Sequence, residues 1–364
     1  MTPLRFTVAA IVLGILGIAG CIAGAIIDPS AFFRAWLCSY LFWLGLPLAG
    51  ITLVLVHDLS GGNWMGTARP ILDAAIVTMP LASLAGIPAF VGLHSLYAWT
   101  HPPADLANVF YLNPTAFFIR YACYVVVWNV LAAFALWGPR EGMLPIRPAL
   151  SWLSGIGLIV LAFSASFAAI DWILSLEPKF WSSIFAYTQA ASWFNTGMAL
   201  VLLVIALAGW PALERRKHMV DLSQILLATT IFWAYVEFMQ LLIIWMENLK
   251  PEIVWYLKRL DSAWHPAIYV SAALGFVIPF FVLLWAPSKR SRAVVAVICS
   301  LILISRLAHT WWLVMPEFDA PTPFWLDVAA VLALGGGVML LFGWAMRVQH
   351  RAPARDPIWT ADHV

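Results

Sequence analysis

The sequence predicts an all-α polytopic membrane protein with ten transmembrane helices, arranged as two four-helix bundles that are parallel repeats, plus two peripheral helices. Composition gives the class, because 63% of the 364 residues are hydrophobic, only 10% are charged and the mean hydropathy is +0.89. No soluble globular class has this balance. The chain has a formal net charge of +2 and no basic block, so nucleic acid is not an expected partner.

Ten windows of about 20 apolar residues are each long enough to cross a bilayer as a helix. They cover residues 6–27, 33–56, 70–93, 114–137, 149–171, 183–208, 222–246, 265–286, 293–315 and 323–346. The run from Ile18 to Cys21 also resembles a lipoprotein cleavage site, but apolar residues continue to Ile27 and favour an uncleaved first span. The four cysteines stand singly within apolar runs and form no haem, iron–sulfur or zinc motif.

Lysine and arginine are unevenly distributed between the loops. If the first residue is cytoplasmic, the cytoplasmic segments hold thirteen of them: Arg5, Arg69, Arg140, Arg147, Arg215, Arg216, Lys217, Lys289, Arg290, Arg292, Arg347, Arg351 and Arg355. The outer segments hold only five: Arg34, Lys179, Lys250, Lys258 and Arg259. The positive-inside rule therefore predicts that both termini are cytoplasmic.

An internal repeat relates the third and fourth spans to the seventh and eighth. Residues 96–99 and 109–112, on either side of an outer loop, recur as residues 243–245 and 254–257. The repeat predicts a first four-helix bundle over 33–178 and a second over 179–320. Residues 1–32 then form a peripheral first span, and residues 321–364 form the last span and a cytoplasmic tail.

One polar turn, residues 171–183, joins the two predicted bundles. Pro178 prevents the preceding helix from continuing, and Trp172 and Trp181 bracket the turn as residues of a membrane interface do. We expect the turn on the outer face. Glu177 and Lys179 there are candidates for stabilising the turn or for docking a partner.

Ionisable residues inside spans are the best indicators of function, because a charge in the bilayer costs about 2.5 to 3.5 kcal/mol even on a lenient scale. Glu237 comes first, since Trp233 at i−4 and Gln240 at i+3 share its helical face. A buried carboxyl group either binds a proton or pairs with a cation. Glu237 is therefore a proton carrier or half of an ion pair with Arg306 or Arg120.

Basic residues occur in the outer half of several spans. Arg306 and His309 stand at i and i+3, so they face the same side of the ninth span. Arg120 and His265 occupy matching places in the repeat, and two basic groups there could line one pocket. The alternative is that each caps neighbouring carbonyl groups or extends to the interface.

Asp73 lies one turn into the third span on the cytoplasmic side. It is either a structural partner for Arg69 at i−4 or the inner site at which protons enter. The candidate polar path as a whole comprises Glu237, Arg120, Asp171, Arg306, His309, Asp73 and Gln240.

Two segments resemble a known family. Residues 171–185, DWILSLEPKFWSSIF, resemble a signature of the smaller polysulfide-reductase-like membrane subunit of alternative complex III, the bacterial quinol:cytochrome c oxidoreductase. Residues 232–245 and 255–259 resemble the second signature of that subunit. The resemblance spans roughly residues 70–315. Lys179 departs from the family pattern, which has a histidine there, and the chain is short for the family.

The resemblance implies a subunit of the bacterial cytoplasmic membrane that lies beside a larger, related quinol-binding subunit. Iron–sulfur and multihaem cytochrome c subunits would carry the iron–sulfur and haem c centres, with lipid and a terminal oxidase as further candidate partners. This chain would hold no cofactor or metal of its own. Its expected role is proton conduction coupled to quinol oxidation. The sequence does not decide whether quinone or quinol contacts this chain or only its neighbour.

Two other functions fit the same residues. Parallel repeats with buried charges also occur in stand-alone secondary transporters, including proton-coupled carriers. A scaffold subunit whose buried charges are only structural ion pairs is the third reading.

Overall fold

The structure is a computed structural model that describes residues 3–61, 65, 68–101, 108–137, 147–207, 212–320 and 322–351. Within these residues every regular element is helical, and ten helical segments are long and apolar enough to cross a membrane. The prediction of an all-α polytopic membrane protein is therefore confirmed. The predicted spans agree with the observed ones to within five residues at each end.

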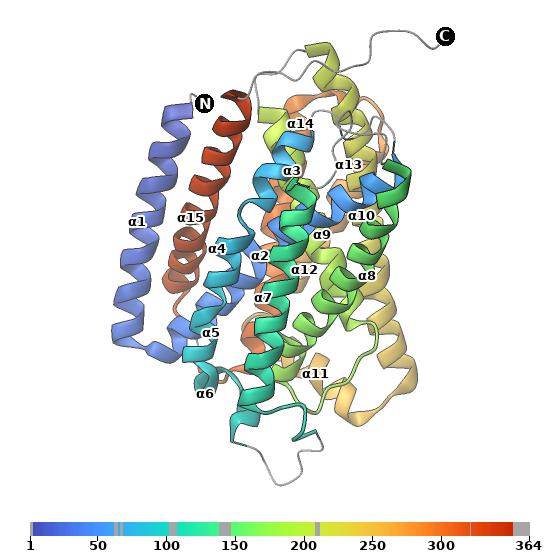
Figure 1. Ribbon diagram of the computed structural model, residues 1–364. Helices are drawn as coiled ribbons and strands as arrows, with labels where there is room; N and C mark the ends of the chain where they lie inside the picture. Colours follow the sequence, from blue (N-terminus) through green and yellow to red (C-terminus); the bar gives the residue numbers. More distant parts are fainter. Residues whose placement is uncertain are drawn as a thin grey trace.

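The helices follow one another along the chain as a series of antiparallel spans (Figure 1). The first five spans are α1 (Pro3–Ile27), α2 (Pro29–Ser60), the series α3 (Arg69–Ile76), α4 (Met79–Ala85), α5 (Ile87–Val91) and α6 (Leu93–Leu96), then α7 (Pro114–Trp137) and α8 (Arg147–Trp172). The other five are α9 (Phe185–Leu207), α10 (Ala212–Glu247), α12 (His265–Ala272) with the π-helical turn η4 (Ala273–Val277) and α13 (Ile278–Leu284), α14 (Arg292–Val314) and α15 (Phe324–Arg351). Helix α11 (Lys250–Leu260) links the seventh and eighth spans. It lies at the end of the molecule opposite the N-terminus of α1 and the C-terminus of α15 (Figure 1). We call this end of the molecule the α11 end.

Local sequence explains where several helices begin and break. Asp28 caps α2, because its Oδ1 accepts a hydrogen bond from the Ala31 amide at 3.0 Å, and Pro29 fits the first helical position. Where the sequence predicted one helix over 70–93, the structure has four short helices. Pro80 and Pro88 each remove a backbone donor and so interrupt the helical hydrogen bonding.

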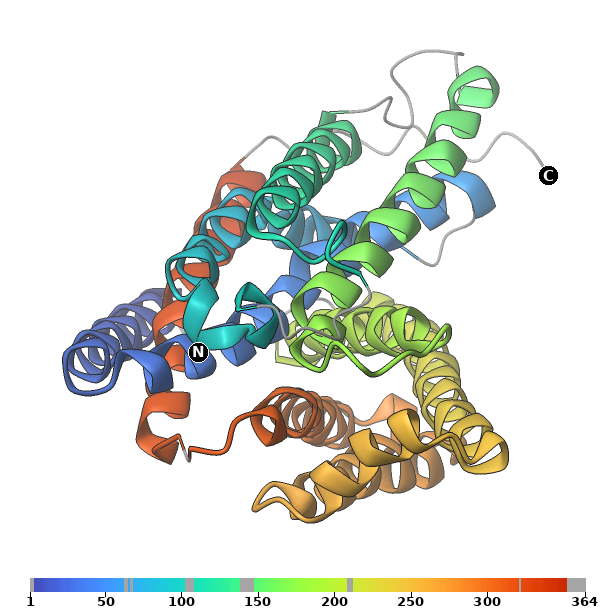
Figure 2. The same cartoon turned by 90° about the horizontal axis from the view of Figure 1, so that it is seen from below.

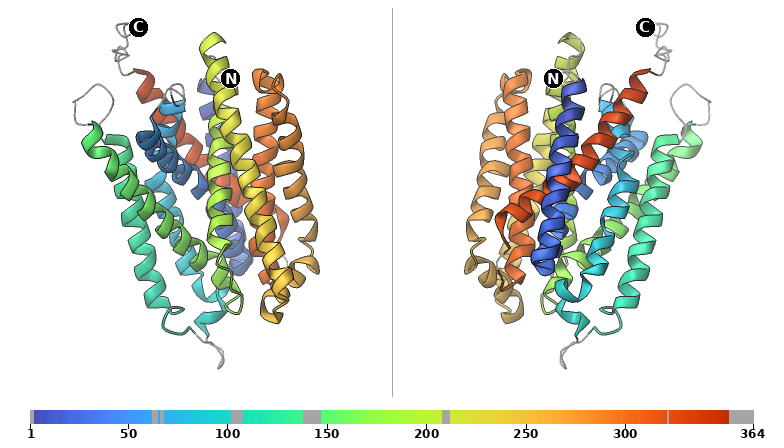
Figure 3. Two further views of the ribbon diagram at one scale, coloured as in Figure 1. Left: turned by 90° about the vertical axis from the view of Figure 1, so that its right-hand side faces the viewer. Right: turned by 90° about the vertical axis from the view of Figure 1, so that its left-hand side faces the viewer.

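Two groups of spans form around α2 and α9. Helix α2 packs against α3, α4, α7 and α8, whereas α9 packs against α10 and α14. Figures 2 and 3 show α7 and α8 on one side of the molecule and α10 to α13 on the other. Helices α2 and α9 pack directly against each other, so they join the two groups at the centre.

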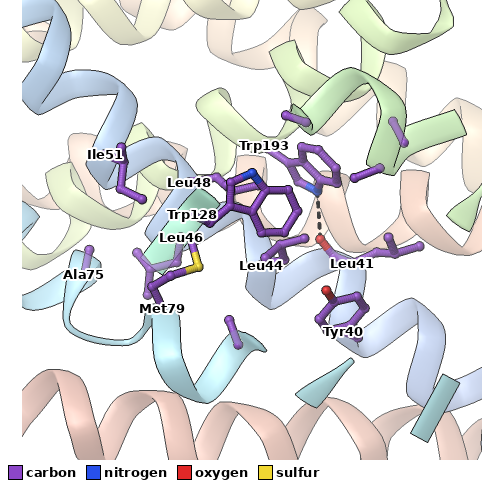
Figure 4. Packing of buried hydrophobic residues seen from close by; sticks show 14 of the residues in the cluster. Tyr40, Leu41, Leu44, Leu46, Leu48, Ile51, Ala75, Met79, Trp128 and Trp193 are labelled. Atoms are coloured by element: carbon purple, nitrogen blue, oxygen red, sulfur yellow. Dashed lines mark hydrogen bonds between the residues drawn. The ribbon is translucent and has the colours of Figure 1, made fainter. Parts of the chain in front are cut away.

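Glycines allow α2 and α9 to approach closely. The Trp193 indole of α9 donates to the Leu41 carbonyl of α2 at 2.8 Å (Figure 4). A Cβ on Gly45 would lie 3.1 Å from the Trp193 ring, and a Cβ on Gly197 would overlap Ala49. Small residues at such contacts are typical of helix packing in membranes.

Helices α1 and α15 lie side by side at the edge of the molecule (Figures 1 and 3). Gly14 of α1 meets Gly336 of α15, and a Cβ on Gly17 would overlap the Ala333 backbone. The opposite face of α1 exposes large apolar side chains such as Ile15 and Leu16. In a bilayer this face contacts lipid.

The α2–α9 contact is testable with one substitution at two glycines. Gly197→Ala places a methyl group against Ala49, and we expect overpacking to cost about 1–3 kcal/mol of stability. Gly155→Ala is the matched control, because the nearest atom to its new Cβ is 3.8 Å away. The thermal midpoint of the purified protein in detergent measures both.

We expect Gly197→Ala to lower the midpoint and Gly155→Ala to leave it unchanged or raised, since alanine favours helix. Adding Ala49→Gly to Gly197→Ala should restore the midpoint. Equal midpoints for Gly197→Ala and Gly155→Ala would contradict the close packing.

Candidate functional site

A buried acid–base pair joins α10 to α14. Glu237 Oε1 lies 3.1 Å from His309 Nε2, which is within ion-pair distance. The imidazole is fully buried, and the glutamate side chain is 15% exposed. Neither atom has a hydrogen-bond partner, so the two groups face each other without good hydrogen-bond alignment. Their attraction depends on whether His309 carries a second proton.

Arg306 lies beside this pair, on the same face of α14 as His309, as the i and i+3 spacing predicted. Its Cζ is 3.3 Å from the centre of the Trp233 ring, which is a close cation–π contact. Its Nη2 donates to Ser305 Oγ at 2.8 Å, but its buried Nε and Nη1 form no hydrogen bond. Arg306 also interacts electrostatically with Glu237. The acid–base pair therefore has a permanent positive charge as its neighbour.

The eighth span is shaped around Arg306. The π-helical turn η4 contains Gly275, and a Cβ at this position would overlap both Arg306 Nη2 and Ser305 Oγ. Ser305 Oγ in turn donates to the Ser271 carbonyl of α12 at 2.9 Å. Single π-helical turns are rare and occur frequently at functional sites.

Two indole rings enclose the His309 imidazole. The Trp233 ring meets it edge-on, with centroids 5.4 Å apart, and the Trp312 ring stacks on it at 5.8 Å. Both indole Nε1 atoms are buried without a hydrogen-bond partner, as is Gln240 Oε1 one turn beyond Glu237. Gln240 Nε2 donates to the Tyr256 hydroxyl at 3.4 Å. Buried polar atoms without partners are rare in native proteins, and here several surround one acid–base pair.

Toward the α11 end the site continues into a network of charges. Arg259 Nη2 lies 2.7 Å from Glu317 Oε1 and donates to the Leu313 carbonyl at 2.6 Å. Lys258 Nζ lies 2.8 Å from Glu317 Oε2 and 3.7 Å from Glu177 Oε2. Burial lowers the pKa of Arg259 to about 10 and Glu317 opposes this shift, so the guanidinium stays charged at neutral pH.

The turn over residues 171–183 packs against α11. The Phe180 ring stacks on the Trp255 ring with centroids 4.5 Å apart, and Glu177 pairs with Lys258. The ion pair joins the turn to α11, and a role of Glu177 in docking a partner stays a prediction. Through these contacts the turn, which joins the two groups of spans, is linked to the charge network of Lys258, Arg259 and Glu317.

Sequence reasoning counted Lys258 and Arg259 among the outer charges, but it did not select them or Glu317 as site residues. A signal was present, because Trp172 and Glu177 have the same spacing at the end of the fifth span as Trp312 and Glu317 have at the end of the ninth. In the structure both span ends close in a 3₁₀ turn, η3 (Leu174–Leu176) and η6 (Met315–Glu317). The shared spacing therefore marks a shared local structure.

Arg120 and Asp171 form a second, separate cluster that joins α7 to α8. Arg120 Nε lies 2.8 Å from Asp171 Oδ2, which also accepts a hydrogen bond from the Tyr124 hydroxyl at 2.6 Å. Arg120 Nη1 donates to the Tyr111 carbonyl at 2.9 Å, and the guanidinium lies 3.8 Å from the Tyr111 ring centre. The buried aspartate and its arginine are thus paired and hydrogen-bonded through Asp171 Oδ2, whereas Asp171 Oδ1 and Arg120 Nη2 are buried without a hydrogen-bond partner.

The remaining predicted residues lie elsewhere. Asp73 pairs with Arg69 at 2.9 Å, as the i−4 spacing predicted, and Arg69 also donates to the Ala135 carbonyl of α7. His265 Nε2 lies 2.9 Å from the Tyr269 hydroxyl on its own helix. Helices α7 and α12 lie on opposite sides of the molecule (Figures 2 and 3), so Arg120 and His265 do not line one pocket.

The seven predicted path residues therefore fall into three places: Glu237, Arg306, His309 and Gln240; Arg120 and Asp171; and Asp73. No direct hydrogen bond or ion pair connects the first two clusters. The close partner of Glu237 is His309 rather than Arg306 or Arg120. Among the described residues, no group of three or more His, Cys, Asp or Glu side chains could hold a metal ion.

The structural role of the Arg120–Asp171 pair is testable. Asp171→Asn leaves a buried guanidinium without its counter-charge, and we expect a loss of about 3–5 kcal/mol in stability. The double change Arg120→Met with Asp171→Leu removes both charges and should recover most of the loss. Asp261→Asn, at an exposed position, is the control. Thermal midpoints in detergent compare the variants, and an Asp171→Asn midpoint equal to that of Asp261→Asn would contradict the role.

Comparison with known proteins leaves the chain without an assigned family. No protein-family model matches it, and no curated protein matches it either. The resemblance of residues 171–185 and 232–245 to a subunit of alternative complex III rests on those residues alone.

Proposed function

We propose that this chain is an integral membrane subunit of a quinol-oxidising respiratory complex, to which it contributes a proton path and no redox centre. The observation that carries the proposal is the fully buried His309 facing Glu237 between two membrane-spanning helices. Ionisable side chains at such positions mark proton relays and ion pathways. The identity of the complex comes from the resemblance of residues 171–185 and 232–245.

The Glu237–His309 pair suits proton transfer. At 3.1 Å the two side chains need only reorient, without rearrangement of the helices, for a proton to move between them, which exchanges a neutral pair for an ion pair of the same total charge. The Arg306 guanidinium lies next to the pair and interacts electrostatically with Glu237. When Arg306 is counted, the cluster has a net charge of about +1 before it releases one proton and about 0 afterwards.

Neutral polar groups extend the path along one face of α10. Ser223, Thr230, Glu237 and Gln240 recur at helical spacing, and all but Glu237 are essentially unexposed. Asn195 of α9 donates to Thr230 Oγ1 at 3.1 Å. Ser223 and Gln240 are 17 positions apart, which is about 25 Å of helix at about 1.5 Å per residue. That length covers most of the roughly 30 Å hydrocarbon core.

The proposal includes an orientation and a set of partners. Both termini face the bacterial cytoplasm, so the α11 end faces outward, where iron–sulfur and multihaem cytochrome c subunits carry the electrons. A larger, related subunit binds quinol beside this chain in the membrane, and a terminal oxidase is a further candidate partner. The Glu237 cluster receives or delivers the protons of quinol oxidation, and quinone contacts this chain where the two membrane subunits meet.

The proton role is tested by Glu237→Gln in the assembled complex. Glutamine keeps the shape of the side chain but does not carry an exchangeable acidic proton, so we expect quinol oxidation, or the protons moved per quinol, to fall by about tenfold or more. Turnover and proton movement are measured together in liposomes. The haem content of the preparation verifies assembly.

Glu247→Gln is the matched control, because it makes the same change at an exposed position at the end of α10. It should leave both quantities unchanged. If Glu237→Gln also has normal turnover and normal proton movement, Glu237 is not part of the path and the proposal is wrong.

A further inference from the structure

A second buried carboxyl group lies outside the Glu237 cluster, where α1, α2 and α15 meet at the α11 end. Asp327 is in the first turn of α15 and is fully buried, and Arg34 of α2 is 5% exposed. Neither carboxyl oxygen of Asp327 accepts a hydrogen bond, and Arg34 Nε and Nη2 donate none. The two side chains interact electrostatically but do not form an ion-pair contact.

Asp327 lies in apolar surroundings. Leu326, Ala329 and Ala330 of α15 pack with Ala31 and Ala35 of α2 in one buried cluster. A carboxylate without donors is strongly disfavoured there, whereas the protonated acid is neutral. The environment therefore selects the protonated form unless Arg34 moves closer.

Arg34 has a second carboxylate within reach. Its Nη2 lies 4.0 Å from Oδ2 of Asp28, whose side chain is 47% exposed. Asp28 is fixed, because its other oxygen caps α2 through the Ala31 amide. Arg34 is held more loosely, with its guanidinium 5.4 Å from the Phe318 ring centre. The Arg34 side chain thus lies between two carboxyl groups, the exposed Asp28 and the buried Asp327, and it is held less tightly than Asp28.

We propose that Asp327 is a proton-binding site, and that Arg34 moves from Asp28 to Asp327 when the proton leaves and returns when it binds. The proton exchanges at the α11 end, where Asp28 is exposed. The titratable and charged groups around Asp327 are Cys21 on α1, Arg34 and Cys38 on α2, and Asp28 between those helices. Helices α3 and α4 also pack against α15, and the charged residues of α3, Arg69 and Asp73, pair with each other. Both thiols are buried and remain neutral.

This site is independent of the proposed path along α10. It lies on the peripheral pair α1 and α15 with α2, and no hydrogen bond or ion pair joins Asp327 to Glu237 or His309. The ligand is a proton, and the readout below needs neither quinol nor turnover.

Infrared difference spectroscopy of the purified protein across a pH series tests the site, because a protonated carboxylic acid has its own carbonyl band. We expect a band that disappears as the pH rises and that is missing in Asp327→Asn. Arg34→Gln should move its disappearance to higher pH, since the cation that replaces the proton is gone. Asp28→Asn keeps the helix cap, because asparagine caps as well as aspartate. It frees Arg34 for Asp327, so the band should disappear about one pH unit lower or more.

Asp28→Asn and Arg34→Gln retain Asp327, so they test the proposal even if Asp327→Asn fails to accumulate. Shifts in opposite directions for these two variants support the exchange of Arg34 between the carboxylates. A band that persists in Asp327→Asn, or that disappears at the same pH in wild type, Arg34→Gln and Asp28→Asn, overturns it.

Discussion

A charged side chain inside the hydrocarbon region must find its partner within the protein, because lipid offers neither a counter-charge nor a hydrogen bond. This constraint explains how the helices of this protein are held in register. Arg120 and Asp171 join α7 to α8, Arg69 joins α3 to the Ala135 carbonyl of α7, and Glu237 and His309 join α10 to α14. Each contact fixes two spans against each other at a defined depth.

The buried clusters differ in how completely they meet that constraint. Oxygen Oδ2 of Asp171 receives a guanidinium and a tyrosine hydroxyl, and such a pair loses stability when either partner is removed. The Glu237–His309 pair has close charges but no aligned hydrogen bond, and unpartnered donors of Arg306 and Trp233 surround it. Buried polar groups without a hydrogen-bond partner are often found at functional sites, because a proton or ligand can use them. We propose a proton-handling role for the Glu237–His309 pair and a structural role for the Arg120–Asp171 pair, in which Asp171 Oδ1 and Arg120 Nη2 also lack a hydrogen-bond partner.

The existence and approximate ends of the spans followed from the sequence, since apolar length alone decides what can cross a bilayer. Helical spacing also gave the shared face of Arg306 and His309 and the pairing of Arg69 with Asp73. The partner of Glu237 could not be derived in this way, because spacing within one helix does not say which face of another helix it meets. That depends on close approaches permitted by single glycines such as Gly197 and Gly275, and on the π-helical turn beside Arg306.

The surroundings of Asp327 could not be predicted from the sequence either. It stands near the start of the last span, and packing of α15 against α1 and α2 buries it completely. The same packing brings it near Arg34, almost three hundred positions earlier in the chain. Long-range contacts of this kind decide which ionisable groups are isolated, and no periodicity in the sequence records them.

We propose that this chain works within a quinol-oxidising complex whose redox centres lie on other subunits. The most direct test is to purify the chain by an affinity tag in mild detergent and to record the absorption spectrum of the fraction that elutes with it on gel filtration. We expect c-type haem in constant ratio to the chain across that peak. A chain that elutes alone and without haem, and that catalyses substrate flux in liposomes by itself, would contradict a role in such a complex and favour a stand-alone transporter.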